Sequence, residues 1–285
     1  MKYSFIQNGI EIIDKSEFNP KHILECGQVF RYQSERLGYK IWAKNSVCYL
    51  ICEKEHDIIS TNHREEFVHF FDLDRNYSEI KKNLLEFPFM KNAIEHGYGI
   101  RILNQDPFEM VLSFIISSNN NIPRIKGIIE RLCERSGETS DCGLRFPSPD
   151  KLRNKSISFF QDLGAGYRAR YLYDTVDAIN NGFSLDIQEM STINARKHLM
   201  RLTGVGRKVA DCVLLFGYHK TDVFPTDTWI DKIYVELFGE NNLSREQKAD
   251  YLSDYYGDLS GYAQQYLFYK RRSGNKIKLD CISED

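Results

Sequence analysis

Apolar and polar positions alternate with a period of two over the first part of the chain. The alternation runs through residues 28–33, 39–43 and 46–52, with a turn at Gly38, and residues 58–61 form a further short candidate. Side chains two positions apart lie on the same face of a strand. Residues 1 to about 75 are therefore predicted to be mainly β, as an antiparallel meander with one buried face.

The apolar period lengthens to that of a helix from Tyr77 onward. Ile80, Leu84 and Leu85 suit one helix and residues 90–96 another. Prolines at 107 and 123 are placed to open helices over 108–116 and 124–133. Residues 167–179 and 261–272 also have helical patterns. The predicted fold is α+β, with an N-terminal antiparallel β-sheet domain at 1–103 packed on a mostly α-helical domain at 104–285.

A tight glycine turn separates two helical patterns in the segment Leu202–Asp211, which includes Gly204, Gly206 and Lys208. Glycine permits a positive φ and a close approach of the main chain to another molecule. The amides that open the second helix have no partners within it, so they suit a phosphate. Lys208 lies in the first turn, where the helix dipole disfavours an ammonium, and a neutral amine is a nucleophile.

An acidic residue follows this turn in the segment Pro225-Thr226-Asp227. Asp227 is placed to cap the helix that starts at the next residue. The turn that would hold phosphate beside the amine of Lys208 indicates covalent chemistry on nucleic acid. The alternative is an ordinary helix corner with a solvated lysine and a capping aspartate.

The charge balance is uneven although the net charge is only −2 for 285 residues. A small negative charge argues mildly against a nucleic-acid partner. However, basic residues gather at Arg168 and Arg170, at Arg207 and Lys208, and at 270–272 with Lys276 and Lys278. We expect a basic groove on an acidic body, with most of these charges solvated.

The seven cysteines are odd in number and irregular in spacing, at positions 26, 48, 52, 133, 142, 212 and 281. Reduced thiols of a cytosolic protein fit this pattern, and Cys48 and Cys52 are interpreted as packing on one strand face. No metal site is expected. No apolar run approaches the ~18 residues that span a bilayer, and the N-terminus has no signal core, so we expect a soluble cytoplasmic protein.

Several segments far apart in the chain resemble the 8-oxoguanine DNA glycosylases of the helix-hairpin-helix superfamily. The hairpin with Lys208 and Asp227 resembles the superfamily's catalytic region. Further matches are Gly27–Arg31, the asparagine-rich Ser117–Ile125, Gly166–Tyr171 and Ala263–Phe268. The resemblance covers nearly the whole chain. It implies that the helical domain is a helix-hairpin-helix glycosylase domain.

The resemblance also implies roles for individual residues. Lys208 and Asp227 would be catalytic. The flipped base would be read by Gln264, stacked between Phe268 and Cys212, and recognised through the carbonyl of Gly27. That carbonyl would accept the N7 hydrogen that 8-oxoguanine has and guanine lacks.

The remaining matched residues would contact DNA around the lesion. Asn119 and Asn120 would lie in the gap left by the extruded base. Arg124 and Arg168 would bond to the orphaned cytosine, with Tyr167 wedged into the stack. The amides of Gly204 and Gly206 would hold phosphate. Two structural alternatives remain open. The asparagines could form only a helix-capping loop, and Phe268 could be only a core residue.

Two positions depart from the family pattern. The family often has His two residues after the catalytic Asp, paired with an Asp three residues after the stacking Phe. This chain has Trp229 and Arg271 there. We expect Arg271 to contact phosphate, with Trp229 packing, and with a cation–π stack between the two as one possible arrangement.

The function expected from the resemblance is excision of 8-oxoguanine opposite cytosine, followed by β-elimination at the abasic site. The partner would be double-stranded DNA containing oxidised guanine. No cofactor is expected, and the protein is expected to be a monomer. In a prokaryote the cytoplasmic enzyme would be associated with the nucleoid. Two alternatives stay open: a glycosylase of the same fold for other bases, and a non-catalytic helix-hairpin-helix DNA-binding module. The four-cysteine iron–sulfur cluster of some relatives is not expected, because only Cys281 follows Cys212.

Overall fold

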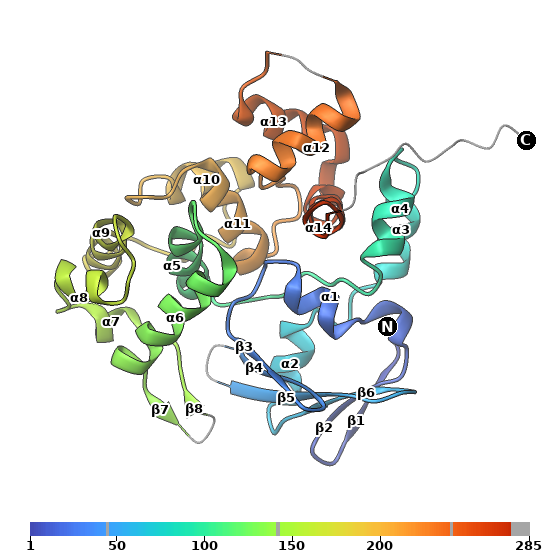
Figure 1. The fold of residues 1–285 in the computed structure, drawn as a ribbon, viewed down its shortest axis with the longest axis horizontal. Coiled ribbons are helices and arrows are strands. Elements are labelled where there is room, and N and C mark those ends of the chain that lie inside the picture. Colours follow the sequence, from blue (N-terminus) through green and yellow to red (C-terminus); the bar gives the residue numbers. More distant parts are fainter. Residues whose placement is uncertain (44–45, 141–142, 240–241, 275–285) are drawn as a thin grey trace, which may run out of the picture.

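The N-terminal part of the protein is a six-stranded antiparallel sheet beneath a group of helices (Figure 1). The structure is a computed structural model that describes residues 1–43, 46–140, 143–239 and 242–274. The strand order is β1-β2-β6-β5-β4-β3. The strands are β1 Tyr3–Ile6, β2 Gly9–Ile12, β3 Tyr32–Glu35, β4 Gly38–Ala43, β5 Ser46–Cys52 and β6 Asp57–Ser60.

Alternation places one face of this sheet in a core. In β5, Ser46, Cys48 and Leu50 are buried while Tyr49 between them is exposed. The buried face packs with Phe67, Phe70 and Phe71 of helix α2, Arg64–Phe70, and its C-terminus. The predicted strands over 39–43, 46–52 and 58–61 are confirmed to within one residue. The β1–β2 hairpin was not predicted, and its insertion beside β6 makes the order different from a simple meander.

Two predictions about this domain are wrong. Only Tyr32 and Gln33 of the alternating run 28–33 lie in a strand. Gln28 is fully buried, and its amide donates to the carbonyls of Ile23 and Arg101, at 3.0 and 2.7 Å. These bonds hold a buried loop, in which apolar and polar side chains alternate as they would in a strand. Cys52 is exposed at the end of its strand, so only Cys48 packs as predicted.

The helices that follow include all those predicted from apolar spacing. Helix α5 lies along α11, and α14 occupies the middle of the helical group (Figure 1). Asp106 and Asn121 cap the two proline-opened helices. The bounds are α1 Pro20–Glu25, α3 Tyr77–Leu84, α4 Met90–His96, α5 Pro107–Ser117, α6 Ile122–Ser136, α7 Pro149–Leu152, α8 Ile157–Asp162, α9 Arg168–Asn180, α10 Thr192–Leu199, α11 Arg207–Tyr218, α12 Thr228–Phe238, α13 Arg245–Tyr256 and α14 Ser260–Arg272, with a short hairpin of β7 Thr139–Ser140 and β8 Gly143–Leu144.

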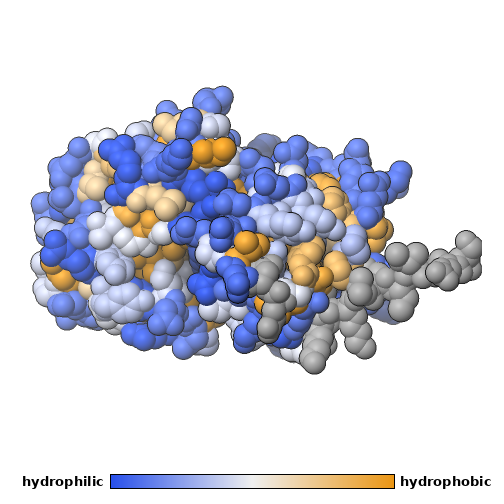
Figure 2. All heavy atoms as spheres, turned by 90° about the horizontal axis from the view of Figure 1, so that it is seen from above, coloured by the Kyte–Doolittle hydropathy of each residue, from blue (hydrophilic) through white to orange (hydrophobic). Residues whose placement is uncertain are grey.

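Two apolar cores meet where the sheet and the helices join. Helices α3 and α4 contribute to the helical core, and α4 packs against α14. Arg101 is fully buried between the two cores, where its Nε donates to the carbonyl of Phe71 and its guanidinium lies 4.0 Å from the Tyr77 ring centroid. The boundary near residue 103 stays a prediction. On the face shown in Figure 2, apolar residues form separate patches among polar ones.

Candidate active site and nucleic-acid interface

The turn between α10 and α11 is held by its contacts with α9. Gly204 has φ +83°, and a Cβ there would lie 2.6 Å from Cγ of Tyr171. The hydroxyl of Thr175 donates to the carbonyl of Thr203 at 3.1 Å. Gly204 is therefore required both for its backbone conformation and for its close packing. Gly206 is extended and faces open space, so the predicted need for a positive φ applies to Gly204 alone.

The N-terminus of α11 is open. Gly206 is its N-cap residue, and no side chain caps the helix there. A helix start that lacks a capping side chain presents main-chain N–H groups and the positive end of the helix dipole. This matches the predicted anion site.

Lys208 lies against the C-terminal turn of α5. Its Nζ is 3.4 Å from Oγ of Ser117 and 5.1 Å from the ring centroid of Phe114. The Ser117 hydroxyl donates to the carbonyl of Phe114 at 2.8 Å, so its lone pairs face the amine. This contact could not be predicted, because a serine ahead of an asparagine loop is interpreted equally well as a helix end.

Asp227 caps α12 as predicted. Its Oδ1 accepts from the main-chain N–H groups of Trp229 and Ile230, at 2.9 and 3.1 Å. Both bonds use one oxygen, so Oδ2 takes no part in the cap. Asp227 and Lys208 line one groove of about 590 Å³, together with Ser117, Ser118, Asn119, Asn120, Gly204, Gly206, Val209, Thr226, Thr228, Trp229 and Arg245.

Two of the predicted base-binding residues lie next to this groove. Cys212 is buried one helical turn after Lys208. Burial raises the pKa of its thiol to about 11, and the neighbouring Lys208 opposes that rise. Gln264 is also buried, and its Nε2 donates to the carbonyl of Pro225 at 3.3 Å. The Gln264 carboxamide therefore holds the segment that leads into Asp227.

The other two predicted base-binding residues contact each other. A Cβ on Gly27, which has φ +86°, would lie 3.3 Å from Cε1 of Phe268 and 3.3 Å from Nη1 of Arg272. Arg272 also donates to the carbonyl of Glu25 at 2.9 Å, which ties the Gly27 loop to the end of α14. Because Gln264 and Phe268 are one turn apart on α14, this helix links the two pairs of residues.

The asparagine loop and α9 meet at the other wall of the groove. Asn119 has φ +48°, a left-handed conformation that asparagine tolerates. Arg168 is buried and donates to the carbonyls of Ser118, Asn119 and Ala165. The Tyr167 ring is 56% exposed and lies 4.4 Å from the Arg168 guanidinium carbon. The structure thus brings these predicted DNA contacts together.

Arg124 and Asn120 complete this wall. Arg124 is exposed, and its Nη2 donates to the carbonyl of Gly164 at 3.1 Å. Asn120 Nδ2 donates to the carbonyl of Ile116 at 3.0 Å, which closes the end of α5. The helix-capping role of the asparagines is therefore present, since Asn121 caps α6.

The arrangement suggested for Arg271 is wrong in one respect. The guanidinium does not stack on Trp229, because its Nη2 pairs with Oε1 of Glu236 at 2.8 Å. The cation over the Trp229 ring is Lys232, whose Nζ lies 5.1 Å from the centroid. Both partners come from α12: the Lys232 contact lies within that helix, and the Arg271–Glu236 pair links it to α14. A phosphate contact by Arg271 stays a prediction.

Three of the clustered basic residues, Arg170, Arg207 and Arg271, have acidic partners. Arg170 pairs with Asp174 at 2.8 Å, and Arg207 pairs with Asp211 and Asp250 at 3.0 and 2.7 Å. The expected groove is therefore less basic than the sequence indicated, because these charges are already neutralised. Lys276 and Lys278 lie outside the described residues.

Asp211 was not predicted to matter. It is fully buried and bonds to Arg196 of α10 at 2.5 Å as well as to Arg207. One carboxylate thus joins the two helices of the hairpin. In sequence it is one acidic residue in an apolar run, and only its burial between two arginines reveals its role.

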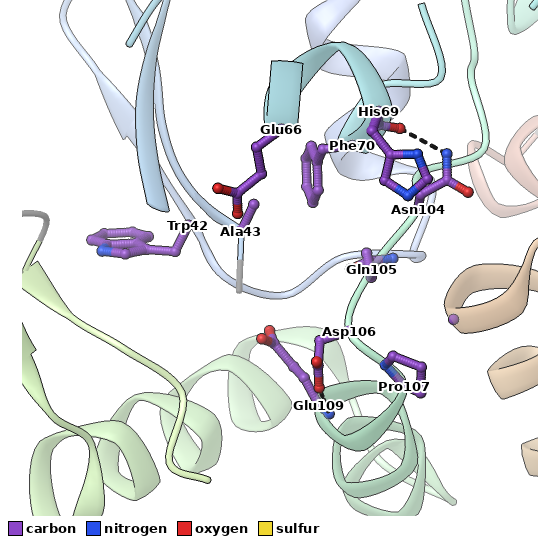
Figure 3. A pocket seen from close by; sticks show the side chains of 11 residues that line it. Trp42, Ala43, Glu66, His69, Phe70, Asn104, Gln105, Asp106, Pro107 and Glu109 are labelled. Carbon is purple, nitrogen blue, oxygen red and sulfur yellow. Dashed lines mark hydrogen bonds between the residues drawn. The ribbon is translucent and has the colours of Figure 1, made fainter. Parts of the chain in front are cut away.

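A second hollow of about 280 Å³ lies between the sheet and α5, away from the predicted site residues. Glu66 of α2 and Glu109 of α5 project from its opposite walls (Figure 3). Burial raises the pKa of Glu109 to about 7, although Arg31 lies 3.6 Å away. Within the described ranges, no group of three His, Cys, Asp or Glu side chains is arranged to hold a metal.

Two further observations concern expected absences. In the part of the chain that the structure describes, no helix has the length and apolarity needed to cross a bilayer. Cys142 and Cys281 lie outside the described residues, so their predicted thiol state has no structural counterpart here.

Comparison with known proteins identifies the family. Residues 11–111 match the model of the 8-oxoguanine DNA glycosylase N-terminal domain, and residues 112–255 match that of the HhH-GPD superfamily base excision DNA repair proteins. A Methanothermobacter thermautotrophicus protein named "Probable N-glycosylase/DNA lyase" is 31% identical over 76% of this chain and 78% of its own. The Saccharomyces cerevisiae N-glycosylase/DNA lyase is 29% identical over 100% of this chain and 93% of its own.

Solved structures agree. One is a crystal structure of the Clostridium acetobutylicum 8-oxoguanine glycosylase/lyase in complex with double-stranded DNA that contains cytosine opposite 8-oxoguanine. Its sequence is 38% identical to this chain, and the two structures superpose with a TM-score of 0.90 over 97% of this chain and 99% of that chain. The Archaeoglobus fulgidus 3-methyladenine DNA glycosylase, at 17% identity and a TM-score of 0.75, shares the fold. The chain therefore belongs to the 8-oxoguanine DNA glycosylase/lyase family of the helix-hairpin-helix base excision repair proteins.

Proposed function

We propose that this protein excises 8-oxoguanine opposite cytosine from duplex DNA and then nicks the abasic strand. The observation that carries the proposal is that Lys208 and Asp227 line one groove with the open start of α11. A nucleophilic amine, a carboxylate and an anion site are the groups that base removal with strand cleavage requires. A non-catalytic DNA-binding module needs only the anion site.

In the proposed reaction the main-chain amides at Gly204 and Gly206 hold phosphate while the damaged nucleotide is flipped out. The free oxygen of Asp227 stabilises positive charge on the sugar. The neutral amine of Lys208 attacks C1′ and the base leaves with the bonding electron pair. The C1′–O4′ bond of the resulting aminal then breaks, with a proton lost from the nitrogen and one gained at O4′, and a Schiff base forms. The Schiff base loses the C2′ proton, and the 3′ phosphate departs by β-elimination. Ser117 and Phe114 hold the amine in place before attack.

Base selection is assigned to residues beside the groove. Gly27 and Phe268 already contact each other, and Gln264 and Cys212 lie next to the catalytic pair. Opposite-base selection is assigned to Arg124, Arg168 and Tyr167, with Asn119 and Asn120 filling the gap. The cytosine-containing complex of the Clostridium acetobutylicum protein supports this choice of partner base. A cytoplasmic, nucleoid-associated monomer stays the expectation.

Borohydride trapping on a panel of duplexes tests the proposal. Each duplex carries one lesion, such as 8-oxoguanine, an alkylated purine or an oxidised pyrimidine, opposite cytosine or another base. We expect a covalent adduct mainly with 8-oxoguanine opposite cytosine. The Asp227→Asn variant should slow single-turnover excision by about 10²–10³, the usual effect of removing one electrostatic stabiliser. Trapping with another lesion alone would favour the glycosylase for other bases.

A further inference from the structure

Trp229 lies at the mouth of the groove with much of its ring exposed. Its exposed fraction is 39%, and it lines the same groove as Lys208 and Asp227. Its main chain is fixed, because its N–H donates to Asp227. A large apolar ring that is fixed in a groove and left half-exposed indicates a surface that a ligand covers.

Lys232 lies over this ring. It is one turn further along α12, and its Nζ lies 5.1 Å from the ring centroid. No carboxylate among the described residues forms an ion pair with Lys232. The neighbouring Asp231 is already occupied by Arg245 at 2.6 Å and Lys248 at 3.5 Å. Lys232 therefore keeps an uncompensated positive charge beside the groove.

Arg271, in contrast, has a carboxylate partner. Its guanidinium is 17% exposed and pairs with Glu236, so α12 and α14 are held together by that pair. A cation that already has a carboxylate partner gains little from a phosphate, since it must first give up that partner. Of Lys232 and Arg271, the charge available to DNA next to Asp227 is thus that of Lys232.

We propose that Lys232, held over the ring of Trp229, is the residue that binds the backbone phosphate beside the flipped nucleotide. The indole positions the ammonium and packs against the deoxyribose, while Arg271 and Glu236 join the two helices behind it. The inference rests on the proposed function only in taking the lesion strand as the occupant of the groove.

Salt dependence of binding tests this inference without base excision. The probe is a duplex with a tetrahydrofuran abasic analogue opposite cytosine, which contains no glycosidic bond. Its affinity is therefore independent of which lesion the enzyme removes, and a failed trapping experiment and a failed binding experiment remain distinguishable. Each phosphate neutralised by a lysine adds about −0.9 to the slope of log K against log salt.

Lys232→Met should make the slope less negative by about 0.9, whereas Lys232→Arg should keep the wild-type slope. Arg271→Met should also keep it. Lys54→Met, in an exposed turn of the sheet domain, is the matched control for loss of one lysine charge. A wild-type slope in Lys232→Met overturns the proposal, as does a reduced slope in Arg271→Met or Lys232→Arg.

The role proposed for the Trp229 ring is tested by comparing two substitutions. Trp229→Phe keeps an aromatic face for the ammonium, and Trp229→Leu does not. At fixed salt, Trp229→Leu should bind the same duplex about two- to fivefold more weakly than Trp229→Phe, the usual range for an exposed cation–π contact. Equal affinities of the two variants would overturn the role of the ring.

Discussion

The two ends of helix α11 differ in how their polar groups are satisfied. At its start, Gly206 supplies no capping side chain, and Lys208 rests on a hydroxyl and an aromatic ring. At its end, His219 adopts a left-handed conformation with φ +52° and contacts Asp72 at 3.4 Å and the Tyr262 hydroxyl at 3.3 Å. One end leaves groups available for a ligand, and at the other the His219 Nε2 contacts groups inside the protein while its Nδ1 is buried without a hydrogen-bond partner.

This difference shows how one helix can serve both chemistry and stability. Groups that act on a substrate must be short of partners in the free protein, which costs stability. The cost is offset where the same helix is anchored, by Asp211 near its middle and by the junction with the sheet domain at its end. Substitutions should therefore affect activity at the start of α11 and stability further along it.

The largest effect is expected at the groove. Lys208→Gln should remove borohydride trapping on the 8-oxoguanine duplex completely, because no amine remains to attack C1′. The free energy of unfolding should change by no more than about 1 kcal/mol, because the side chain contributes only its contacts with Ser117 and Phe114. Chemical denaturation and trapping of the same preparation check this. Persistent trapping would mean that another amine is the nucleophile.

The second largest effect is expected at the centre of the helix. Asp211→Asn should lower the free energy of unfolding by about 3–5 kcal/mol, because the fully buried carboxylate that pairs with both Arg196 and Arg207 is lost. Urea denaturation measures this. The matched control is Asp174→Asn, whose partner Arg170 lies on the surface and which should change stability little. Similar losses in both variants would contradict the anchoring role of Asp211.

A smaller effect is expected at the opposite wall of the groove. Arg124→Ala should reduce the preference for cytosine over other opposite bases by about tenfold, since one base-directed hydrogen-bond donor is worth roughly 1–3 kcal/mol of discrimination. Arg168→Ala should relax the preference as well but also lower the melting temperature, because its guanidinium holds the asparagine loop. Single-turnover rates on four duplexes check this, and unchanged ratios would remove the cytosine-reading role.

The last prediction is a pH dependence of stability at the far end of α11. Burial lowers the pKa of His219 from 6.5 to about 4, against the opposing effect of Asp72. Between these values the unfolded chain binds a proton that the folded protein does not. Above pH 6.5, His219 is neutral in both states and does not change the free energy of unfolding. As the pH drops from 6.5 toward 4, the free energy of unfolding falls by at most about 3 kcal/mol.

His219→Asn isolates this contribution. Asparagine tolerates the left-handed conformation and does not titrate. Thermal melts between pH 7.5 and 4.5 should show a shallower decline in the variant than in the wild type. Parallel curves would mean that other groups carry the acid sensitivity of the junction.

Local sequence determined the parts of the site that are built within one turn of chain. The glycine turn before Lys208, the Asp227 cap and the proline-opened helices were all predictable, because their partners lie within a few residues. The same reasoning failed for Gln28, whose alternating neighbours indicated a strand. Its hydrogen-bond partner Arg101 is 73 residues away, and no local pattern reveals it.

Only the tertiary structure decided which charges are available and what holds the nucleophile. Lys208 meets Ser117 across 91 residues, and Arg207 meets Asp250 across 43. In the sequence, Arg207 and Arg271 look like a DNA-binding surface, and Lys232 is one lysine among many. The fold pairs the two arginines with carboxylates and leaves Lys232 beside Trp229. A charge acts on a ligand only if the folded chain has not already neutralised it, and that depends on contacts between distant segments.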